Sequence, residues 1–231
     1  MSYIFEPPAI PSVAIAGSDA RFPVRRIFCV GRNYEAHALE MGLQPTRGEP
    51  MFFTKPADAV VESGSTIPYP PETENFHYEG ELVVAIGADG FRVPEEQVPE
   101  MIFGYGIGID LTRRDLQAKA RDAGRPWDWA KGFDNSAPCS ALTPIKKTGE
   151  LTSGEIRLSV NGEVRQDADI SQMIWTVREI VSLISNSMHL KKGDLIYTGT
   201  PAGVGAVGPG DRLVASIEGL PELTLTIGEP E

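Results

Sequence analysis

Two glutamates near the middle of the chain are the first side chains whose spacing suggests chemistry. Glu79 and Glu81 lie two positions apart in FHYEGELVVAIG (76–87), whose apolar, β-branched run predicts a strand. Residues two apart in a strand point to the same face, so the two carboxylates would lie side by side and repel each other. A bound divalent cation would offset that repulsion. A solvated strand face remains the alternative, because the spacing alone fits both.

A third carboxylate, Asp110, ends the apolar run GYGIGID, whose alternating glycines permit close backbone approach. An acid at the end of such a run is a poor fit for a simple surface. Three carboxylates without cysteine, and with little histidine, describe a site for a hard cation, Mg²⁺ or Mn²⁺, with Ca²⁺ possible in a crystal, and not for zinc. Taken alone, Asp110 can instead cap a helix that begins near Thr112.

His37 and Glu40 form a possible acid–base pair on a short predicted helix. Positions three apart are neighbours on one helix face, and a carboxylate beside an imidazole orients the ring and raises its basicity. This arrangement is typical of a general-base dyad. An ordinary surface pair of histidine and glutamate has the same spacing, so the pair by itself does not decide between the two.

Further polar residues lie where they can meet a substrate. Lys131 follows two tryptophans in RPWDWAKGFD, where partial desolvation would suit it to pair with a carboxylate or an oxyanion. Arg114 and Gln117, three positions apart on the helix after Asp110, can reach one site together. The alternatives are a lysine whose stem lies along the surface and an exposed helix face.

The elements that must position these residues indicate an α+β fold. A strand is predicted over 26–31, and Asn33 is expected to cap a helix that runs to Met41. Asn161-Gly162 predicts a hairpin turn. Helices are also predicted over 112–123 and 171–186, and the last third returns to strands. We expect an extended arm over 1–24 and a single catalytic domain over 25–231.

Composition limits the classes of partner. The 231 residues carry a net charge of -11, which disfavours nucleic acid, and no stretch approaches the ~20 apolar residues that a membrane span needs. The N-terminal stretch lacks the regions of a signal peptide. Cys29 and Cys139 sit among apolar or small residues and are expected to be buried free thiols, which favours a cytoplasmic protein.

Five motifs, in order, resemble those of the fumarylacetoacetate hydrolase family over about residues 25–227. They are VGRNYEAHALEMG (30–42), FHYEGELVVAIG (76–87), GYGIGIDLTRRDLQ (104–117), WAKGFD (129–134) and GDLIYTGTPAGVG (193–205). The resemblance implies a mixed β-sandwich roll with a few short helices, usually a homodimer. Within the family, the N-terminal stretch is most similar to bacterial fumarylpyruvate hydrolases.

The resemblance also assigns roles to individual residues. It implies that the metal ligands are Glu79, Glu81 and Asp110, and that the dyad acting on water is His37 and Glu40. The lysine that faces the substrate would be Lys131, and the polar residues that bind the substrate would be Arg114, Gln117 and Thr200. Larger family members add a fourth carboxylate before the dyad, but this chain reads Gly31-Arg32-Asn33 there. We therefore expect three protein ligands, with waters completing the shell.

The expected activity is metal-dependent hydrolysis of a carbon–carbon bond in a 2,4-diketo acid. Fumarylpyruvate, cleaved to fumarate and pyruvate during aromatic degradation of the gentisate type, is the expected substrate. An acylpyruvase, an oxaloacetate decarboxylase or a keto-acid isomerase of the same family are the alternatives. The expected partner is thus a small anionic keto acid.

Overall fold

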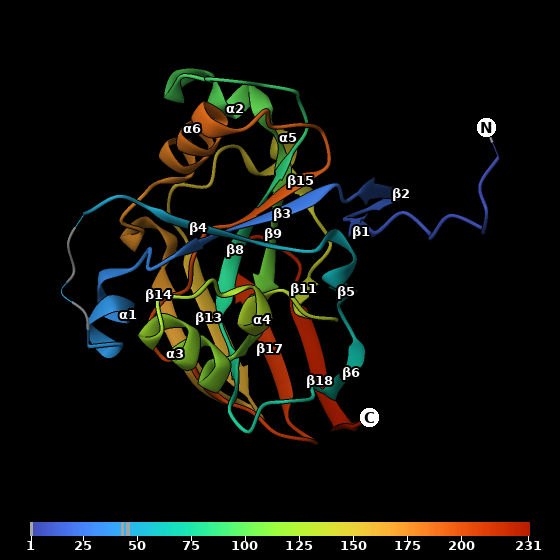
Figure 1. Cartoon of the computed structure of the whole chain (residues 1–231). Helices are drawn as coiled ribbons and strands as arrows, with labels where there is room; N and C mark the ends of the chain where they lie inside the picture. Colours follow the sequence, from blue (N-terminus) through green and yellow to red (C-terminus); the bar gives the residue numbers. More distant parts are fainter. Residues whose placement is uncertain (1, 43, 45–46) are drawn as a thin grey trace.

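A mixed eight-stranded sheet forms the centre of the computed structural model, which describes residues 2–42, 44 and 47–231 (Figure 1). Most neighbouring strands are antiparallel, but β15 runs parallel to β3, and β11 parallel to β5. The strands, in spatial order, are β4 (Met51–Lys55), β3 (Arg26–Gly31), β15 (Asp194–Tyr197), β8 (Gly80–Ile86), β9 (Ile102–Ile109), β11 (Ala137–Cys139) and β5 (Val60–Glu62), with β12 (Thr143–Pro144) also pairing with β9.

A five-stranded sheet packs against one face of the central sheet, and two small sheets complete the fold. The five strands, in spatial order, are β14 (Glu163–Asp169), β13 (Glu155–Val160), β17 (Arg212–Ile217), β18 (Leu223–Pro230) and β6 (Ser65–Tyr69). The small sheets contain β10 (Thr112–Arg113), β7 (Phe76–Tyr78) and β16 (Gly205–Ala206), and β1 (Ser12–Ile15) with β2 (Ser18–Pro23). The mixed β-roll predicted from the sequence is therefore confirmed.

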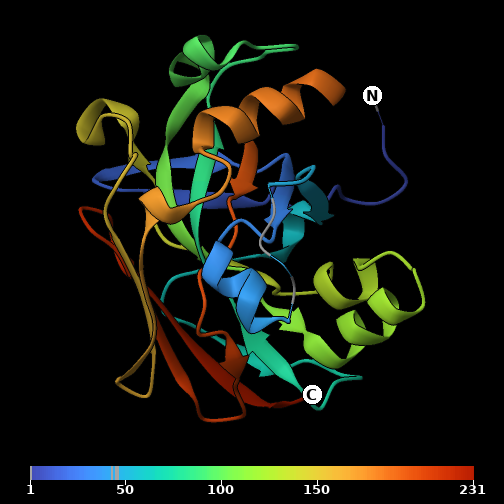
Figure 2. The same ribbon diagram turned by 90° about the vertical axis from the view of Figure 1, so that its left-hand side faces the viewer.

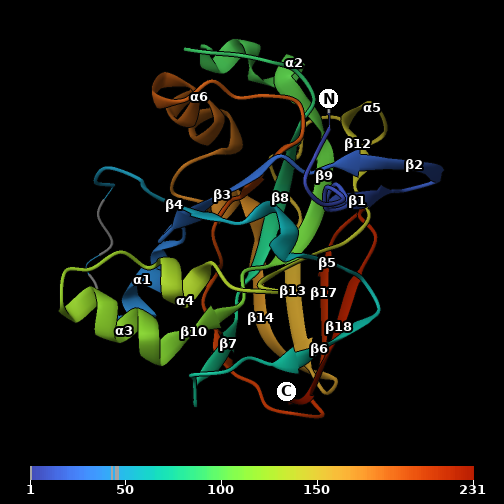
Figure 3. The ribbon, with the colours of Figure 1, turned by 45° about the vertical axis from the view of Figure 1, so that its right-hand side comes forward.

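The helices are short and lie around the sheets. They are α1 (Glu35–Glu40), α2 (Val98–Met101), α3 (Arg114–Asp122), α4 (Asp128–Lys131), α5 (Ile145–Thr148) and α6 (Val177–Ser187), with 3₁₀ turns η1 (Ala57–Ala59), η2 (Glu95–Gln97) and η3 (Ile170–Gln172). In Figures 1 and 3, α1, α3 and α4 gather on one side of the central sheet, whereas α6 and α2 lie together at one end of the molecule. Figure 2 shows α1 from its outer side, between the sheets and α3.

The core fills both faces of the central sheet. All seven residues of β8 are buried, because Leu82, Val84 and Ile86 pack into the cluster shared with the five-stranded sheet and α6, while Val83 and Ala85 pack into a second cluster. A strand buried on both sides reads as a continuous apolar run and not as an alternation. This is why LVVAI carries no polar face.

Several predicted boundaries shift in the structure. The predicted strand 76–87 is divided into β7 and β8, with Glu79 between them. Asn33 is not the cap of α1: the cap is Tyr34, and the Asn33 amide bonds the backbone of Trp175 and Thr198. Thr112 lies in β10, and α3 begins at Arg114.

The other predicted helix begins later than expected, and the predicted hairpin turn is present. α6 begins at Val177, behind a capping box of Thr176 and Glu179, and not at residue 171. The hairpin prediction is confirmed, since Asn161 and Gly162 both have positive φ, as a type I′ turn requires.

The N-terminal segment is only partly an extended arm. Residues 12–23 form the β1–β2 hairpin, with Val13 and Phe22 buried in the second core cluster. The preceding residues, from 2 onward, carry exposed apolar side chains and extend away from the body in Figure 1. Within the described residues, no helix combines the length and the apolar character needed to cross a membrane.

Candidate metal centre and active site

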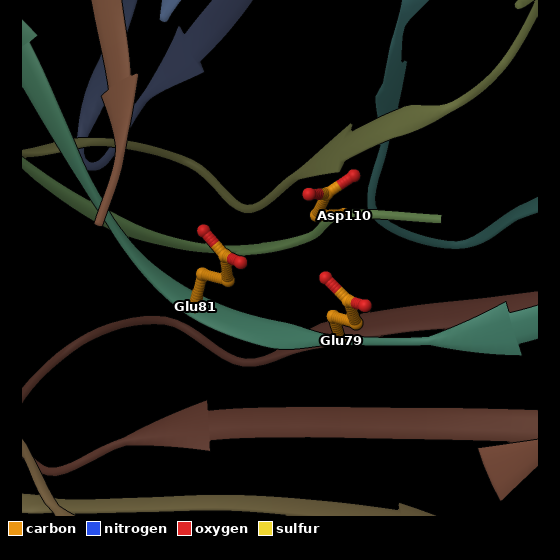
Figure 4. A group of neighbouring side chains, drawn as sticks. All are labelled: Glu79, Glu81 and Asp110. Carbon is orange, nitrogen blue, oxygen red and sulfur yellow. The ribbon is translucent and has the colours of Figure 1, made fainter. Parts of the chain in front are cut away.

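Three carboxylates converge where β8 and β9 come together. The antiparallel register pairs Gly80 with Ile109, and the Asp110 N–H donates to the Glu79 carbonyl across 2.8 Å, so the end of β9 is fixed beside the start of β8. One oxygen from each of Glu79, Glu81 and Asp110 lies within 4.8 Å of the others, and all three residues are buried. Figure 4 shows the three side chains directed toward a shared space.

A glycine in β9 makes this approach possible. A Cβ at Gly108, which pairs with Glu81, would lie 2.4 Å from the Tyr197 ring and 2.7 Å from a Val83 methyl group. Any side chain there would force β9 away from β15, and Asp110 away from the glutamates with it.

Buried cations hold the carboxylates in place. Lys131 Nζ donates to Glu79 Oε2 and to Asp110 Oδ2, each across 2.7 Å, and is itself 1% exposed. Arg114 Nη2 donates to Glu79 Oε1 across 2.5 Å. The predicted substrate lysine is therefore in direct contact with two of the three predicted metal ligands.

Lys55 is a third buried cation, which the sequence reading did not identify. Its Nζ lies 2.8 Å from Asp110 Oδ1 and donates to the carbonyls of Leu111 and Lys131. Its place directly after the apolar run MFFT was the only sequence signal, and since Lys55 is the one buried residue of β4, its ammonium needs a partner inside the protein.

Burial and the neighbouring charges shift the pKa values of Glu79, Glu81 and Lys131. Burial alone would raise the pKa of Glu79, but Lys131 and Arg114 hold that pKa well below its usual range. Burial, with the nearby charges of Asp110 and Glu79, raises the pKa of Glu81. Burial would lower the pKa of Lys131, yet Asp110 and Glu79 raise it, so its ammonium stays charged.

The donor set fits a hard divalent cation. Asp110 Oδ1 is buried and makes no aligned hydrogen bond within the part of the chain that is described, although Lys55 Nζ is close to it. Glu81 uses Oε2 to accept from the Gly199 N–H, which orients the side chain and leaves Oε1 available. Three carboxylates at mutually short distances match the oxygen ligands that Mg²⁺ and Mn²⁺ prefer.

The dyad predicted on the first helix forms in the structure, and its histidine lines a cavity. His37 Nδ1 donates to Glu40 Oε2 across 3.2 Å, because an ionised carboxylate can only accept. Both oxygens of Glu40 in turn accept from the Gly203 N–H, at 3.0 and 3.2 Å. His37 lines the cavity, and Nε2 is the ring nitrogen left to meet a water.

A cavity joins the dyad to the carboxylates. All the predicted site residues line it except Glu40 and Asp110. The lining residues come from β3, α1, β4, β8, α3, α4 and the loops beside them: Val30, Gly31, Arg32, His37, Met41, Phe53, Glu79, Glu81, Arg114, Gln117, Ala118, Arg121, Trp127, Lys131 and Thr200.

The polar residues predicted to bind substrate are partly engaged within the protein. Arg114 Nη1 donates to Gln117 Oε1 across 2.5 Å, so the two side chains act as a unit. The Thr200 hydroxyl donates to the Gly80 carbonyl and accepts from Gln166 Nε2. Its hydroxyl proton is thus directed at the backbone between the two glutamates, and its predicted bond to substrate stays a prediction.

Gln166 is a second residue that the sequence reading missed. Its Oε1 accepts from the Gly80 N–H across 2.9 Å, while its Nε2 also donates to the Pro201 carbonyl. The side chain therefore ties the backbone between the two glutamates to the loop at Thr200. No sequence signal marks it, because it lies in the solvent-facing hairpin strand β14, where a glutamine is ordinary.

Comparison with known proteins agrees with this geometry. The family description "Fumarylacetoacetate (FAA) hydrolase C-terminal" matches residues 26–228. A fumarylpyruvate hydrolase from Ralstonia is 51% identical over 180 residues, which cover 78% of this chain and 93% of that protein. The oxaloacetate tautomerase of Escherichia coli is 41% identical over 204 residues, which cover 88% and 93%.

A solved structure extends the likeness to nearly the whole chain. The crystal structure of fumarylpyruvate hydrolase from Pseudomonas aeruginosa, in complex with Mn²⁺ and pyruvate, superposes with a TM-score of 0.96 at 51% identity. The match covers 99% of this chain and all of that one. By sequence and by fold, this chain belongs to the fumarylacetoacetate hydrolase family.

Proposed function

We propose that this chain hydrolyses a carbon–carbon bond in a 2,4-diketo acid and that fumarylpyruvate, cleaved to fumarate and pyruvate, is its substrate. The observation that carries the proposal is one cavity lined by His37, which Glu40 orients, and by Glu79 and Glu81 of the carboxylate triad. The two similar fumarylpyruvate hydrolases, one of them crystallised with Mn²⁺ and pyruvate, support the choice of substrate.

Glu79, Glu81 and Asp110 would hold the divalent cation, Mg²⁺ or Mn²⁺. Once bound there, the cation supplies Lewis acidity and a template for the 2-oxo acid end of the substrate. Lys131 bridges Glu79 and Asp110 and keeps their oxygens in place. Its raised pKa keeps a full positive charge beside the site where the pyruvate end would lie.

The dyad would activate the water. Glu40, anchored by the Gly203 N–H, orients the His37 ring, and Nε2 takes a proton from water as its oxygen adds to the C4 carbonyl. The C3–C4 bond then breaks, and its electron pair passes to C3 of the pyruvate unit as an enolate. Lys131 stabilises this charge. The proton that His37 took from water is returned to C3, which completes pyruvate, and the acyl part leaves as fumarate.

A tautomerase or decarboxylase acting on oxaloacetate is the second candidate, because the Escherichia coli relative is an oxaloacetate tautomerase. Neither reaction adds water to a carbonyl, but tautomerisation also needs a base that moves a proton, so the His37–Glu40 pair fits both. The higher identity to fumarylpyruvate hydrolase, 51% against 41% to the tautomerase, favours the hydrolase.

We also propose the remaining features that the family resemblance implies: a homodimer in the cytoplasm, serving aromatic breakdown. The buried free thiols of Cys29 and Cys139 are consistent with a reducing compartment. Size-exclusion chromatography with light scattering tests the dimer.

The test of the activity is a direct assay. Purified protein with Mn²⁺ or Mg²⁺ is given fumarylpyruvate, acetylpyruvate and oxaloacetate, and products are followed by chromatography. We expect fumarate and pyruvate from fumarylpyruvate, and no such turnover with EDTA. Turnover of oxaloacetate alone would instead establish the second candidate.

A further inference from the structure

The cavity has a second cationic end on the face of α3. Arg114, Gln117, Ala118 and Arg121 all line the cavity, and their spacing of three, four and seven positions places them on one helix face. Arg114 touches Glu79 at the inner end of the helix, whereas Arg121 lies two turns further along. One face of α3 therefore runs from the carboxylate triad toward the cavity mouth.

We propose that Arg121 binds the distal carboxylate of the substrate and so selects dicarboxylic 2,4-diketo acids over acylpyruvates with uncharged acyl groups. The inference rests on the proposed function, since it names the substrate class of the same site. Arg121 belongs to neither the predicted metal ligands nor the dyad. It lines the cavity because the fold places this face of α3 there.

The distance along α3 from Arg114 to Arg121 is similar to the distance between the two carboxyl groups of fumarylpyruvate. Seven helical positions separate Arg114 from Arg121, a rise of about 10 Å at 1.5 Å per residue. Fumarylpyruvate has a carboxyl group at each end of an extended seven-carbon chain, roughly 8 Å apart with carbon–carbon bonds of ~1.5 Å. With its 2-oxo acid end at the triad, the substrate presents its other carboxylate within reach of the Arg121 side chain.

The inner cations are bound to buried carboxylates, whereas Arg121 pairs with an exposed neighbour. Arg114 is paired with Glu79 and Gln117, and Lys131 with two carboxylates. Among residues 2–42, 44 and 47–231, the one bond that Arg121 donates from its side chain is from Nε to its exposed neighbour Asp122. Its terminal nitrogens remain to donate to a carboxylate in the paired geometry that guanidinium groups favour.

The wall between the two ends suits an unsaturated chain. Phe53 and Trp127 both line the cavity, and their rings meet edge to face with centroids 5.9 Å apart. Flat apolar surfaces of this kind pack well against a conjugated carbon–carbon double bond. The cavity thus offers a charged inner end, an apolar wall and a second cation, in the pattern that a fumaryl group presents.

The experiment compares Arg121→Gln with Lys119→Gln, which removes the same charge from the same helix at an exposed position outside the cavity lining. KM and kcat are measured with Mn²⁺ for fumarylpyruvate and for acetylpyruvate, which lacks a distal carboxylate. Pyruvate inhibition is measured in parallel, because pyruvate has no distal end and reports whether the inner site is intact.

We expect Arg121→Gln to raise KM for fumarylpyruvate by about tenfold or more, with KM for acetylpyruvate and the pyruvate inhibition constant unchanged. Lys119→Gln should leave all three constants unchanged, and Arg121→Lys should recover part of the loss. Equal effects on both substrates, or none on fumarylpyruvate, would overturn the role of Arg121. Failure of the unaltered chain to cleave either substrate would instead refute the proposed function.

Discussion

Replacing Lys55 by methionine tests the charge arrangement of the site. The substitution keeps the volume and the apolar stem but removes the ammonium 2.8 Å from Asp110 Oδ1. It also leaves the carbonyls of Leu111 and Lys131 without their donor. Both effects act inside the protein, since the Lys55 and Asp110 side chains are at most 1% exposed.

The expected loss of stability is large. Removing one partner of a buried ion pair costs about 3–5 kcal/mol, because the remaining charge is left uncompensated. Lys131 still contacts Asp110 in the variant, so we expect the lower end, about 3 kcal/mol. For a chain of this length, about 2–4 °C is lost per kcal/mol, so the Tm of the metal-free protein should fall by roughly 6–12 °C.

Metal should recover much of that loss. A divalent cation at the triad supplies the positive charge that the variant lacks, and a ligand that binds only the folded state stabilises it in proportion to its affinity. We therefore expect Mn²⁺ to raise the Tm of Lys55→Met by several degrees more than it raises the Tm of the unaltered chain.

The assay is thermal unfolding in EDTA and in saturating Mn²⁺. Lys191→Met is the matched control, because Lys191 pairs with Asp89 at 2.9 Å on the surface, where such a pair contributes about 0–1 kcal/mol. The reasoning is refuted if metal-free Lys55→Met unfolds within about 1 kcal/mol of the unaltered chain, a difference typical of an exposed pair. An equal rise in Tm with Mn²⁺ for Lys55→Met and for the unaltered chain would refute it as well.

Three further changes test other parts of the site. His37→Gln should lower kcat by about 10²–10⁴ while calorimetry shows unchanged Mn²⁺ affinity, so a kcat within tenfold of normal would remove the dyad from the mechanism. Glu81→Ala should weaken Mn²⁺ binding in calorimetry by more than about tenfold and abolish turnover, and full activity at ordinary Mn²⁺ concentrations would contradict its role as a ligand. Gly203→Ala puts a Cβ about 2.0 Å from the Arg165 carbonyl at a φ of 97° and moves the N–H that anchors Glu40. It should lower both the Tm and kcat, and a normal kcat would show that the anchor is dispensable.

Local patterns in the sequence predicted much of the fold. The strand at 26–31 has the predicted bounds, and the Asn161-Gly162 turn joins β13 to β14. These features depend on neighbouring residues, since a turn type or a strand run is encoded in a few consecutive positions. The convergence of Glu79 and Glu81 was also predictable, because the two lie two positions apart, although the predicted strand is interrupted at Glu79.

Two predicted helix starts were wrong because the residues there have other partners. Asn33 was expected to cap α1, but its amide bonds the backbone on either side of the site, at Trp175 and Thr198. The helix predicted from Thr112 begins at Arg114, because Thr112 pairs with His77 in β10 and its hydroxyl donates to the Asp110 carbonyl two residues back. At Asn33, tertiary contacts override the local preference of the residue type.

Contacts between residues far apart in the sequence could not be predicted from local patterns. The pairings of Lys55 with Asp110 and of Gln166 with Gly80 join residues more than fifty positions apart, and no local pattern encodes the sheet order that brings them together. Arg114 was predicted to face substrate, yet it also pairs with Glu79, which only the antiparallel β7–β10 contact makes possible.

The buried charges around the triad explain how one site can be stable and still favour the reaction. Lys55, Arg114 and Lys131 pair with Glu79 and Asp110, and Glu81 adds a third carboxylate nearby. The protein alone is therefore close to neutral there when all six groups are charged. A bound divalent cation adds two positive charges, and the carboxylate at the 2-oxo acid end of a substrate offsets only one. The second is offset only when the carbon–carbon bond breaks and negative charge develops on the departing pyruvate unit. An interaction completed only at that point lowers the barrier instead of tightening substrate binding. The same three cations therefore stabilise the buried carboxylates before metal binds. With metal and substrate bound, they leave the site with one uncompensated positive charge until the transition state.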